Sequence, residues 1–304
     1  MEKIRHHHYV WRYYLRPWAS NEKIACLREG KIFKTNPMGV AQKRDFYKLQ
    51  ELNSDELVFI KRLAIDTAPK FLQESHTNLV RQFNIVFKLR GYIESKGIND
   101  QELNNLLDAA IHNGEEYLHT YIERTAIKYI KSILREDTEF YNTDEGCWDF
   151  IYFLCMQYVR TKKVKESIIE AVSNITTINF EKVCNILNHI FATNMGSGFY
   201  AERKLFKMVL LKNEAAKEFI TGDQPVINTY GAIGLSKTPT DDIELYYPVS
   251  PKLAILISEK EEYKGIRTKL LNENDVVSYN NLILKNSHSQ VYATSVSVLE
   301  EYNR

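Results

Sequence analysis

The middle of the chain has the spacing of apolar residues that is typical of helices. Between residues 54 and 194, apolar positions recur every three or four residues, and polar capping residues precede several of the runs. Residues 99–102 (Asn-Asp-Gln-Glu) resemble a capping box, and the apolar positions after them lie at i, i+3, i+4 and i+7: Leu103, Leu106, Leu107 and Ala110. Asn113 and Gly114 then predict the start of a further helix.

Two later stretches also predict helices. Residues 148–159 are apolar on nearly every face, which indicates a helix at the centre of the fold. Residues 179–195 keep their large apolar side chains on one face. Gly196 and Gly198 follow directly, and we expect them to end that helix as C-capping residues do.

After Gly198 the pattern changes to short apolar runs bounded by turns, which is typical of strands. The expected strands are 206–211, 218–221, 244–247, 253–257 and 291–296, with a helix over 275–284. Near the N-terminus, residues 23–28 and 31–34 flank Glu29 and Gly30 and predict a β-hairpin.

These elements predict an α+β fold. A small mixed or antiparallel sheet would be built from both ends of the chain, with a large helical part in the middle. We expect residues 1–53 and 199–304 to form one mixed α/β module that carries the sequence motifs, and residues 54–198 to form a helical insertion.

The composition is that of an ordinary globular protein of 304 residues, 44% hydrophobic and 26% charged, which excludes a disordered chain. The formal net charge of +1 hides an asymmetry. The first 50 residues carry eleven Lys and Arg against four acidic residues, a net of +7, so the remainder carries −6. The basic segment favours an anionic partner such as nucleic acid.

The four cysteines show no CxxC pair and no spacing typical of zinc sites: Cys26, Cys147, Cys155 and Cys184. We expect free thiols in a reducing compartment, with Cys155 and Cys184 buried in helices. The first residues contain no apolar signal segment, and the most apolar stretch, 147–159, is too short to cross a bilayer. The sequence therefore predicts a cytoplasmic protein that does not enter a membrane.

Four short motifs are spread over nearly the whole chain. They are residues 7–18 (HHYVWRYYLRPW), 219–226 (FITGDQPV), 248–251 (PVSP), and a weaker helical motif of Gln157, Arg160 and Thr161. In order and spacing they resemble an uncharacterised family of mostly microbial proteins with the motifs HHYVPxFYLRxF, FITSDxPV and PLSP. Trp11 stands where that family has proline, and Gly222 where it has serine. The family is a domain of unknown function, so the resemblance implies relatives but no reaction.

The first motif contains the first candidate site residues, His7 and His8. A neutral imidazole can act as a general base or a metal ligand near pH 7. Adjacent residues of a strand point to opposite faces, so at most two of the three histidines at 6–8 would reach one site. We favour His7 and His8 over His6; the alternative is a flexible N-terminus without a site.

The second candidate is Asp223, which follows an apolar strand and precedes Gln224 and Pro225. Side chains at the ends of strands are well placed for catalysis. Ordinary turn chemistry, in which the carboxylate accepts nearby backbone N–H groups, explains the same residue types. Because the resemblance includes this aspartate, we favour a functional role.

The third candidate is Arg160, with Gln157 three residues earlier on the same helix face. The planar guanidinium is suited to holding a phosphate or a carboxylate. Together with Arg12 and Arg16 of the basic segment, it predicts an anion pocket. For the three lysines that follow Arg160, attraction to the helix C-terminus is a sufficient explanation.

Two other patterns are weaker. Glu116 and His119 have the i, i+3 spacing of carboxylate-bridged di-metal sites, but no second such pair occurs, and we expect a solvated helix face. Residues 262–264 (Glu-Tyr-Lys) match the ExK arm of some metal nucleases in a tract where charged residues are common. The chain has no GxGxxG, GxxxxGK[ST], HExxH or GxSxG motif, which leaves P-loop, zincin and α/β-hydrolase mechanisms unsupported.

These residues favour a nucleic-acid-processing enzyme, most specifically a nuclease of a microbial defence or toxin system. His7 or His8 would act as the general base or as a metal ligand, and Asp223 as a ligand or as the group that orients a histidine. Arg160 and Arg12 would hold the scissile phosphate. The sequence leaves open whether a divalent metal is needed.

Two alternatives also stay open. The protein could be a non-catalytic module that binds a nucleotide, RNA or another anion. It could instead be a structural partner in a larger complex or homo-oligomer, with the motifs only joining the ends of the chain. In that last case His7→Ala and Asp223→Ala would lower thermal stability, because buried polar networks are costly to break.

Overall fold

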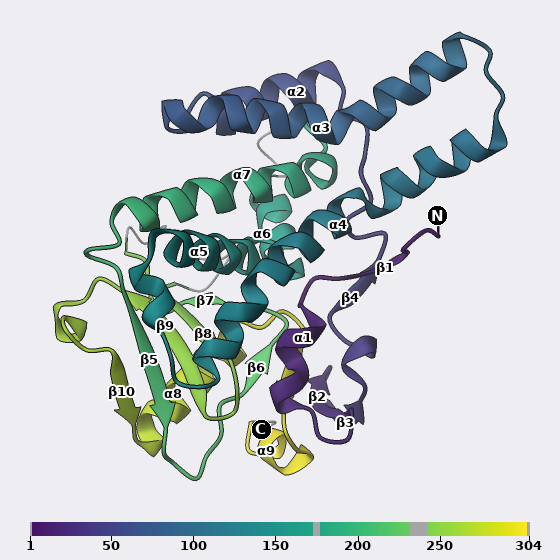
Figure 1. The fold of residues 1–304 in the computed structure, drawn as a ribbon. Coiled ribbons are helices and arrows are strands. Elements are labelled where there is room, and N and C mark those ends of the chain that lie inside the picture. The colour runs from purple at the N-terminus through teal and green to yellow at the C-terminus, as the bar shows by residue number, and fades with distance from the viewer. Residues whose placement is uncertain (1, 173–176, 232–241, 303–304) are drawn as a thin grey trace.

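The computed structural model describes residues 2–172, 177–231 and 242–302, and the fold is α+β, as predicted (Figure 1). Helices account for 54% of it and fill the middle of the chain. The helices are α1 (Arg12–Leu15), α2 (Ser54–Ile60), α3 (Lys70–Ser95), α4 (Gln101–Ile133), α5 (Asp144–Val159), α6 (Lys162–Val172), α7 (Phe180–Ala201), α8 (Glu273–Asn286) and α9 (Val296–Glu300). Short helical turns are η1 (Arg16–Trp18), η2 (Pro37–Gly39), η3 (Lys61–Ile65), η4 (Glu139–Asn142) and η5 (Glu261–Tyr263).

The strands of the described residues form three sheets. The largest has the order β10 (Thr268–Leu271), β5 (Lys207–Asn213), β9 (Leu253–Ser258), β8 (Leu245–Pro248) and β7 (Ile227–Asn228); its β10–β5 pair is parallel and its other pairs are antiparallel. An antiparallel sheet of four strands has the order β3 (Lys31–Thr35), β2 (Ile24–Arg28), β11 (Gln290–Ala293) and β6 (Thr221–Gly222). A third pairs β1 (His6–His8) with β4 (Gln42–Arg44). The β2–β11 pair confirms that both ends of the chain share a sheet, and β2 with β3 is the predicted hairpin.

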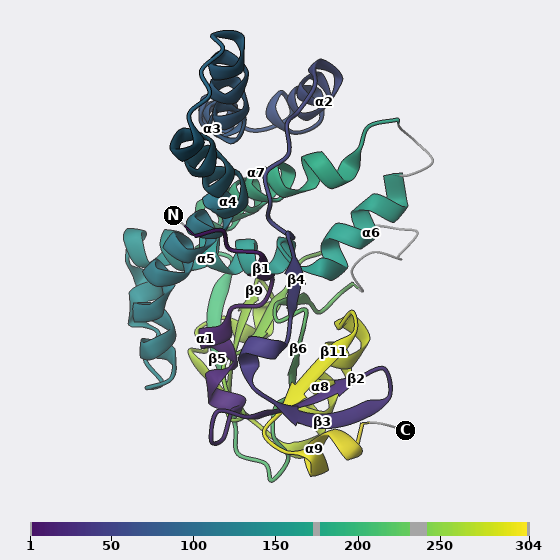
Figure 2. The same cartoon turned by 90° about the vertical axis from the view of Figure 1, so that its right-hand side faces the viewer.

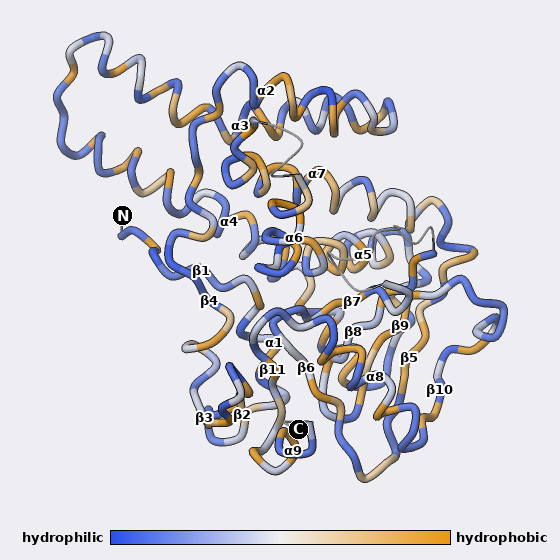
Figure 3. Tube along the Cα trace, turned by 180° about the vertical axis from the view of Figure 1, so that it is seen from behind, coloured by the Kyte–Doolittle hydropathy of each residue, from blue (hydrophilic) through white to orange (hydrophobic). Residues whose placement is uncertain are grey.

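The predicted central helix is α5, which packs between α4, α7 and the five-stranded sheet (Figure 1). Because its sequence is apolar on nearly every face, it can be buried on all sides. Phe150, Leu154 and Cys155 have no exposed surface. Hydrophobic residues concentrate in α5, α7 and the strands beneath them (Figure 3).

The helix start predicted at Asn113 and Gly114 is wrong, because α4 continues through both residues. Asn113 is fully buried, and its side chain accepts a hydrogen bond from the Ile4 N–H (2.8 Å) and donates one to the Glu2 carbonyl oxygen (2.9 Å). A Cβ at position 114 would lie 3.3 Å from Cδ1 of Leu49. The Asn-Gly pair therefore accommodates segments packed against α4 and does not begin a helix.

Three other predicted ends are also wrong. Helix α7 continues past Gly196 to Ala201, because its packing on α5 outweighs the poor helix propensity of glycine. The strand expected at 218–221 is reduced to β6. The Phe219 N–H donates to the Pro251 carbonyl oxygen, and the Ile220 N–H donates to Asn280 Oδ1. The strand expected at 291–296 ends at Ala293, and α9 follows after its N-cap at 295.

The N-terminal motif is tied to the second motif by buried side chains. The Tyr14 hydroxyl lies 2.5 Å from Thr221 Oγ1, and Trp18 Nε1 donates to the carbonyl oxygen of Phe219 at 3.0 Å. Tyr14 also stacks on Tyr247 with ring centroids 4.9 Å apart. These contacts hold the N-terminal motif against residues 219–221 and against Tyr247 of β8. The four-stranded sheet and α9 lie at the opposite end of the molecule from α2 and α3 (Figure 2).

The largest core cluster includes residues from the N-terminal motif, α4, α5 and the five-stranded sheet. This cluster contains residues from both sides of the expected boundary at 198. The division of the chain into a mixed α/β module and a helical insertion stays a prediction. All four cysteines are free thiols, and all four are buried, whereas the sequence predicted burial for Cys155 and Cys184. Within the described ranges, every helix is too short or too polar to cross a membrane.

Candidate functional site

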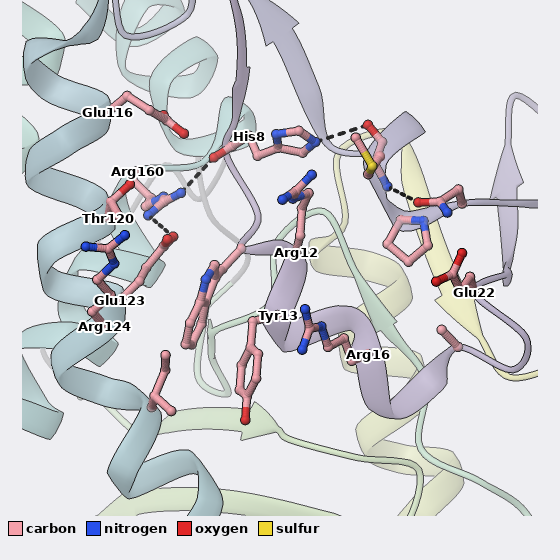
Figure 4. A pocket seen from close by; sticks show the side chains of 16 residues that line it. His8, Arg12, Tyr13, Arg16, Glu22, Glu116, Thr120, Glu123, Arg124 and Arg160 are labelled. Carbon is pink, nitrogen blue, oxygen red and sulfur yellow. Dashed lines mark hydrogen bonds and ion pairs between the residues drawn. The ribbon is translucent and has the colours of Figure 1, made fainter. Parts of the chain in front are cut away.

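A pocket of about 680 Å³ lies between the N-terminal motif and α4 (Figure 4). The end of β1, α1, η1 and η2 form one side, and α4 with the residue after α5 forms the other. The lining includes one histidine and seven charged residues: His8, Arg12, Arg16, Glu22, Glu116, Glu123, Arg124 and Arg160. The structure thus brings together four of the predicted site residues, His8, Arg12, Arg16 and Arg160.

Arg160 is the C-cap residue of α5 and is only 2% exposed. Its Nη1 donates to Glu123 Oε1 at 2.7 Å, and its Nη2 donates to the backbone carbonyl oxygen of His8, also at 2.7 Å. Burial alone would lower the pKa of Arg160, but Tyr47, Glu123 and Glu116 outweigh it and raise that pKa, so the side chain stays charged. The positive charge of Arg160 is therefore largely compensated inside the protein, by the Glu123 carboxylate and the His8 carbonyl oxygen.

The His8 ring lines the pocket, and its Nε2 lies 3.1 Å from the carbonyl oxygen of Met38. A carbonyl oxygen only accepts, so Nε2 carries the proton in the neutral ring and Nδ1 keeps its lone pair. Burial, together with Arg12 and Arg160, lowers the pKa of His8. The ring is therefore neutral near pH 7, with Nδ1 available as a base.

Arg12 and Arg16 present guanidinium groups to the same pocket (Figure 4). Both are exposed, and neither forms a salt bridge with any residue that the structure describes. Arg16 lies over the ring of Tyr13, with its Cζ 5.0 Å from the ring centroid. Trp11 and Tyr13 are in contact at 4.9 Å between centroids and give this side of the pocket an aromatic surface.

The sequence did not predict the side of the pocket formed by α4, and it placed Glu116 on a solvated helix face, whereas Glu116 lines the pocket with a buried carboxylate oxygen. Burial raises the pKa of Glu116 to about 7, although Arg160 acts in the opposite direction. Its Oε2 is buried and has no hydrogen-bond partner among the described residues. Glu116, Thr120, Glu123 and Arg124 follow at i, i+4, i+7 and i+8, so a polar stripe along one face of the helix was the signal that could have found them.

His7 does not line the pocket and is fully buried. Its Nδ1 accepts a hydrogen bond from the Tyr47 N–H (2.8 Å), and its Nε2 lies 3.1 Å from the Ile4 carbonyl oxygen. Both ring nitrogens are therefore used to join β1 to its neighbours. Gln157 is also buried away from the pocket.

Asp223 lies away from the pocket, beneath the loop that follows α8. Its carboxylate accepts hydrogen bonds from the backbone N–H groups of His288 (2.7 Å), Ser289 (2.9 Å) and Gln290 (3.1 Å), and from the Ser289 hydroxyl (3.0 Å). Burial raises the pKa of Asp223 in spite of these donors. The contacts are those of a carboxylate that anchors a loop, and its donors come from a segment distant in sequence.

One cluster of potential metal ligands occurs in the described part of the chain, at Glu115, His119 and His189. All three residues are buried, and α4 supplies two of them while α7 supplies the third. Burial lowers the pKa of His119 to about 3, so its ring is neutral. His119 is thus not on the solvated helix face that the sequence predicted.

The fold and the pocket define an α+β protein with a basic, aromatic-lined cavity. The chain belongs to the family described as "Protein of unknown function (DUF4238)", whose model matches residues 6–297. This confirms the family resemblance of the motifs. No curated protein and no solved structure matched the chain.

Proposed function

We propose that the pocket binds a nucleic-acid strand through a backbone phosphate. The observation that supports this most directly is the pair of exposed guanidinium groups, Arg12 and Arg16, that face the pocket without a carboxylate partner among the described residues. An anion placed between them would gain charge-assisted hydrogen bonds that the free protein does not satisfy internally.

The remaining lining suits a nucleotide. Trp11 and Tyr13 both line the pocket, and we expect a base to stack on this aromatic side of it; such stacking does not depend on the base sequence. The volume of about 680 Å³ is in the range of pockets that hold small organic ligands. Because Glu123 neutralises Arg160, this proposal does not have Arg160 hold the phosphate. Arg160 instead fixes the backbone at His8 through its hydrogen bond to the His8 carbonyl oxygen.

Fluorescence anisotropy with labelled single-stranded RNA and DNA oligonucleotides tests the proposal. We expect Arg12→Gln and Arg16→Gln to weaken binding by tenfold or more. The matched control is Arg28→Gln, because Arg28 is also exposed, belongs to the same basic segment and lies over the Phe33 ring at 5.1 Å, but does not line the pocket. Absence of binding, or equal weakening by all three substitutions, would contradict the proposal.

RNA cleavage is a second candidate function, supported by the fixed tautomer of His8. Nδ1 would take the proton of a ribose 2′-hydroxyl, the 2′ oxygen would attack the adjacent phosphorus, and the bond to the 5′ oxygen would break as that oxygen takes a proton from water. Arg12 and Arg16 would stabilise the charge that develops on the phosphate oxygens. The products would be a 2′,3′-cyclic phosphate and a 5′-hydroxyl.

This second candidate is tested by incubating RNA, single-stranded DNA and duplex DNA with the protein in Mg²⁺, Mn²⁺ or EDTA. We expect cleavage of RNA alone, unaffected by EDTA. His8→Gln should abolish cleavage and retain binding, because glutamine offers an amide N–H but no base. Cleavage of DNA, or a requirement for metal, would rule out this mechanism; absence of any cleavage would leave binding as the function.

A further inference from the structure

We propose that Glu115, His119 and His189 bind a first-row transition-metal ion of the Zn²⁺ type. Glu115 and His119 are one turn apart on α4, and His189 faces them from α7. The proposal is independent of the function assigned to the pocket, since none of the three residues lines it.

The distances between these three side chains fit ligands of one shared metal ion better than they fit hydrogen bonds from one side chain to another. Oε1 of Glu115 lies 3.5 Å from His119 Nε2 and 3.6 Å from His189 Nε2. These distances exceed the usual 2.7–3.2 Å of an N–H···O hydrogen bond. Metal–ligand bonds of about 2.1 Å around a tetrahedral ion place two ligands about 3.4 Å apart. The three ligand atoms also lie within 4.8 Å of one another.

The two imidazole rings lack other partners. His119 is 2% exposed and His189 1%, and none of their four ring nitrogens has a hydrogen-bond partner among the residues that the structure describes. Burying polar atoms in this way costs free energy unless something satisfies them. An ion held between the two Nε2 atoms and Glu115 would satisfy one nitrogen of each ring.

Neighbouring side chains hold the ligands in place. Asn185, one turn before His189 on α7, donates from Nδ2 to Glu115 Oε2 at 2.9 Å, which leaves Oε1 facing the two rings. Tyr47 packs on the His119 ring at 4.4 Å, and the two histidine rings stack at 5.1 Å. The carboxylate has the outer hydrogen bond that metal ligands usually have, whereas the Nδ1 atoms do not. We therefore expect weaker binding than in fully supported zinc sites.

The donor set selects the class of ion. Two imidazoles with one carboxylate suit Zn²⁺, Fe²⁺ or Co²⁺, whereas Ca²⁺ and Mg²⁺ prefer oxygen donors only. Three protein ligands leave a fourth position for water. Because the cluster joins α4 to α7, the bound ion would fix one helix against the other, and its main effect would be on stability.

The test begins with the wild-type chain stripped of metal by a chelator and dialysed. Zn²⁺ is titrated against a chromogenic competitor, and bound metal is counted by mass spectrometry after gel filtration. We expect one ion per chain and a higher melting temperature with Zn²⁺ than without it. X-ray absorption on the Zn²⁺-loaded wild type should show two imidazole ligands, a readout that needs no variant. No retained ion, or an ion without imidazole ligands, would overturn the proposal.

Variants locate the ion. Glu115→Gln keeps the size of the side chain and its contact with Asn185, and we expect it to weaken Zn²⁺ binding more than tenfold. Two control variants should keep the ion: His76→Gln, in which a buried histidine that bonds Asn194 (2.8 Å) is replaced, and His6→Ala, which removes an exposed histidine. Unchanged binding in Glu115→Gln, or loss in His6→Ala, would place the ion elsewhere and overturn the assignment.

Discussion

The Arg160 guanidinium donates a hydrogen bond of 2.7 Å to the backbone carbonyl oxygen of His8, across 152 positions of sequence. Two of the motifs that the sequence singled out therefore meet directly. A further buried hydrogen bond, from the Thr161 hydroxyl to Gln224 Oε1, connects the helical motif to the second motif. The motifs converge in space, but they do so largely by bonding to one another and only partly by lining a common pocket.

Arg160→Ala is expected to destabilise the protein by about 3–5 kcal/mol, because it leaves the Glu123 carboxylate buried without its partner. Urea unfolding followed by circular dichroism measures the change. Arg124→Ala is the control, since Arg124 lines the same pocket but is exposed and should change the free energy of unfolding by less than about 0.5 kcal/mol. Equal effects of the two substitutions would mean that the buried ion pair has no special importance.

Asp223→Asn tests whether that carboxylate has a structural role. Asparagine offers one acceptor oxygen and turns an NH₂ group toward backbone donors, so we expect a loss of about 2–3 kcal/mol in the free energy of unfolding. Asp66→Asn, which removes one partner of an exposed pair with Lys61, should cost less than about 1 kcal/mol. A stable Asp223→Asn protein that has lost a measurable activity would instead favour the catalytic role expected from the sequence.

Much of the fold could be predicted, because the periodicity of apolar residues and the composition of a segment can be observed without knowledge of the rest of the chain. The central helix α5 and the hairpin of β2 and β3 follow from short stretches of sequence. The wrong predictions concern positions at which contacts with a segment distant in the sequence determine the secondary structure. Asn113 and Gly114 resemble a helix start until the N-terminal residues that pack against them are known. β6 is short because Asn280, 60 positions away, takes the Ile220 N–H.

The site was predicted less well than the fold. Arg12, Arg16, His8 and Arg160 line one pocket, as an anion site requires, but nothing in the sequence indicates that Arg160 is already paired with a glutamate of α4. The cluster at 115, 119 and 189 was also not visible. It combines an i, i+4 pair with a histidine 70 positions further along the chain, and only the packing of α4 near α7 brings them together.

His7 gives the protein a pH-dependent contribution to stability. Burial lowers the pKa of His7, and the opposing effects of the Ile4 carbonyl, Glu115 and Asp45 are too small to reverse the shift. The folded state therefore resists protonation that the unfolded chain accepts, so the contribution is complete above the unfolded pKa of about 6.5 and is lost as the pH falls below it. We expect the stability difference between wild type and His7→Gln to shrink from pH 7.5 to pH 5.5, as measured by urea unfolding.

The control for that measurement is His6→Gln, because the His6 side chain is exposed on the same strand. This variant removes a histidine of β1 without removing a buried ring, and the stability of His7→Gln is compared with it at each pH. A difference between wild type and His7→Gln that does not change with pH would show that the buried ring does not titrate differently in the folded and unfolded states.

The salt dependence of nucleic-acid binding distinguishes a direct phosphate contact from an indirect effect of Arg12 and Arg16. Each phosphate of a single strand that the protein neutralises adds about 0.7 to the slope of log K against log salt. Because Arg12 and Arg16 share one phosphate in the proposal, we expect the double substitution Arg12→Gln with Arg16→Gln to reduce that slope by about 0.7, and Arg28→Gln to leave it unchanged. Anisotropy titrations at several salt concentrations give the slopes. If the double substitution weakens binding at an unchanged slope, the two arginines shape the pocket and another group holds the phosphate.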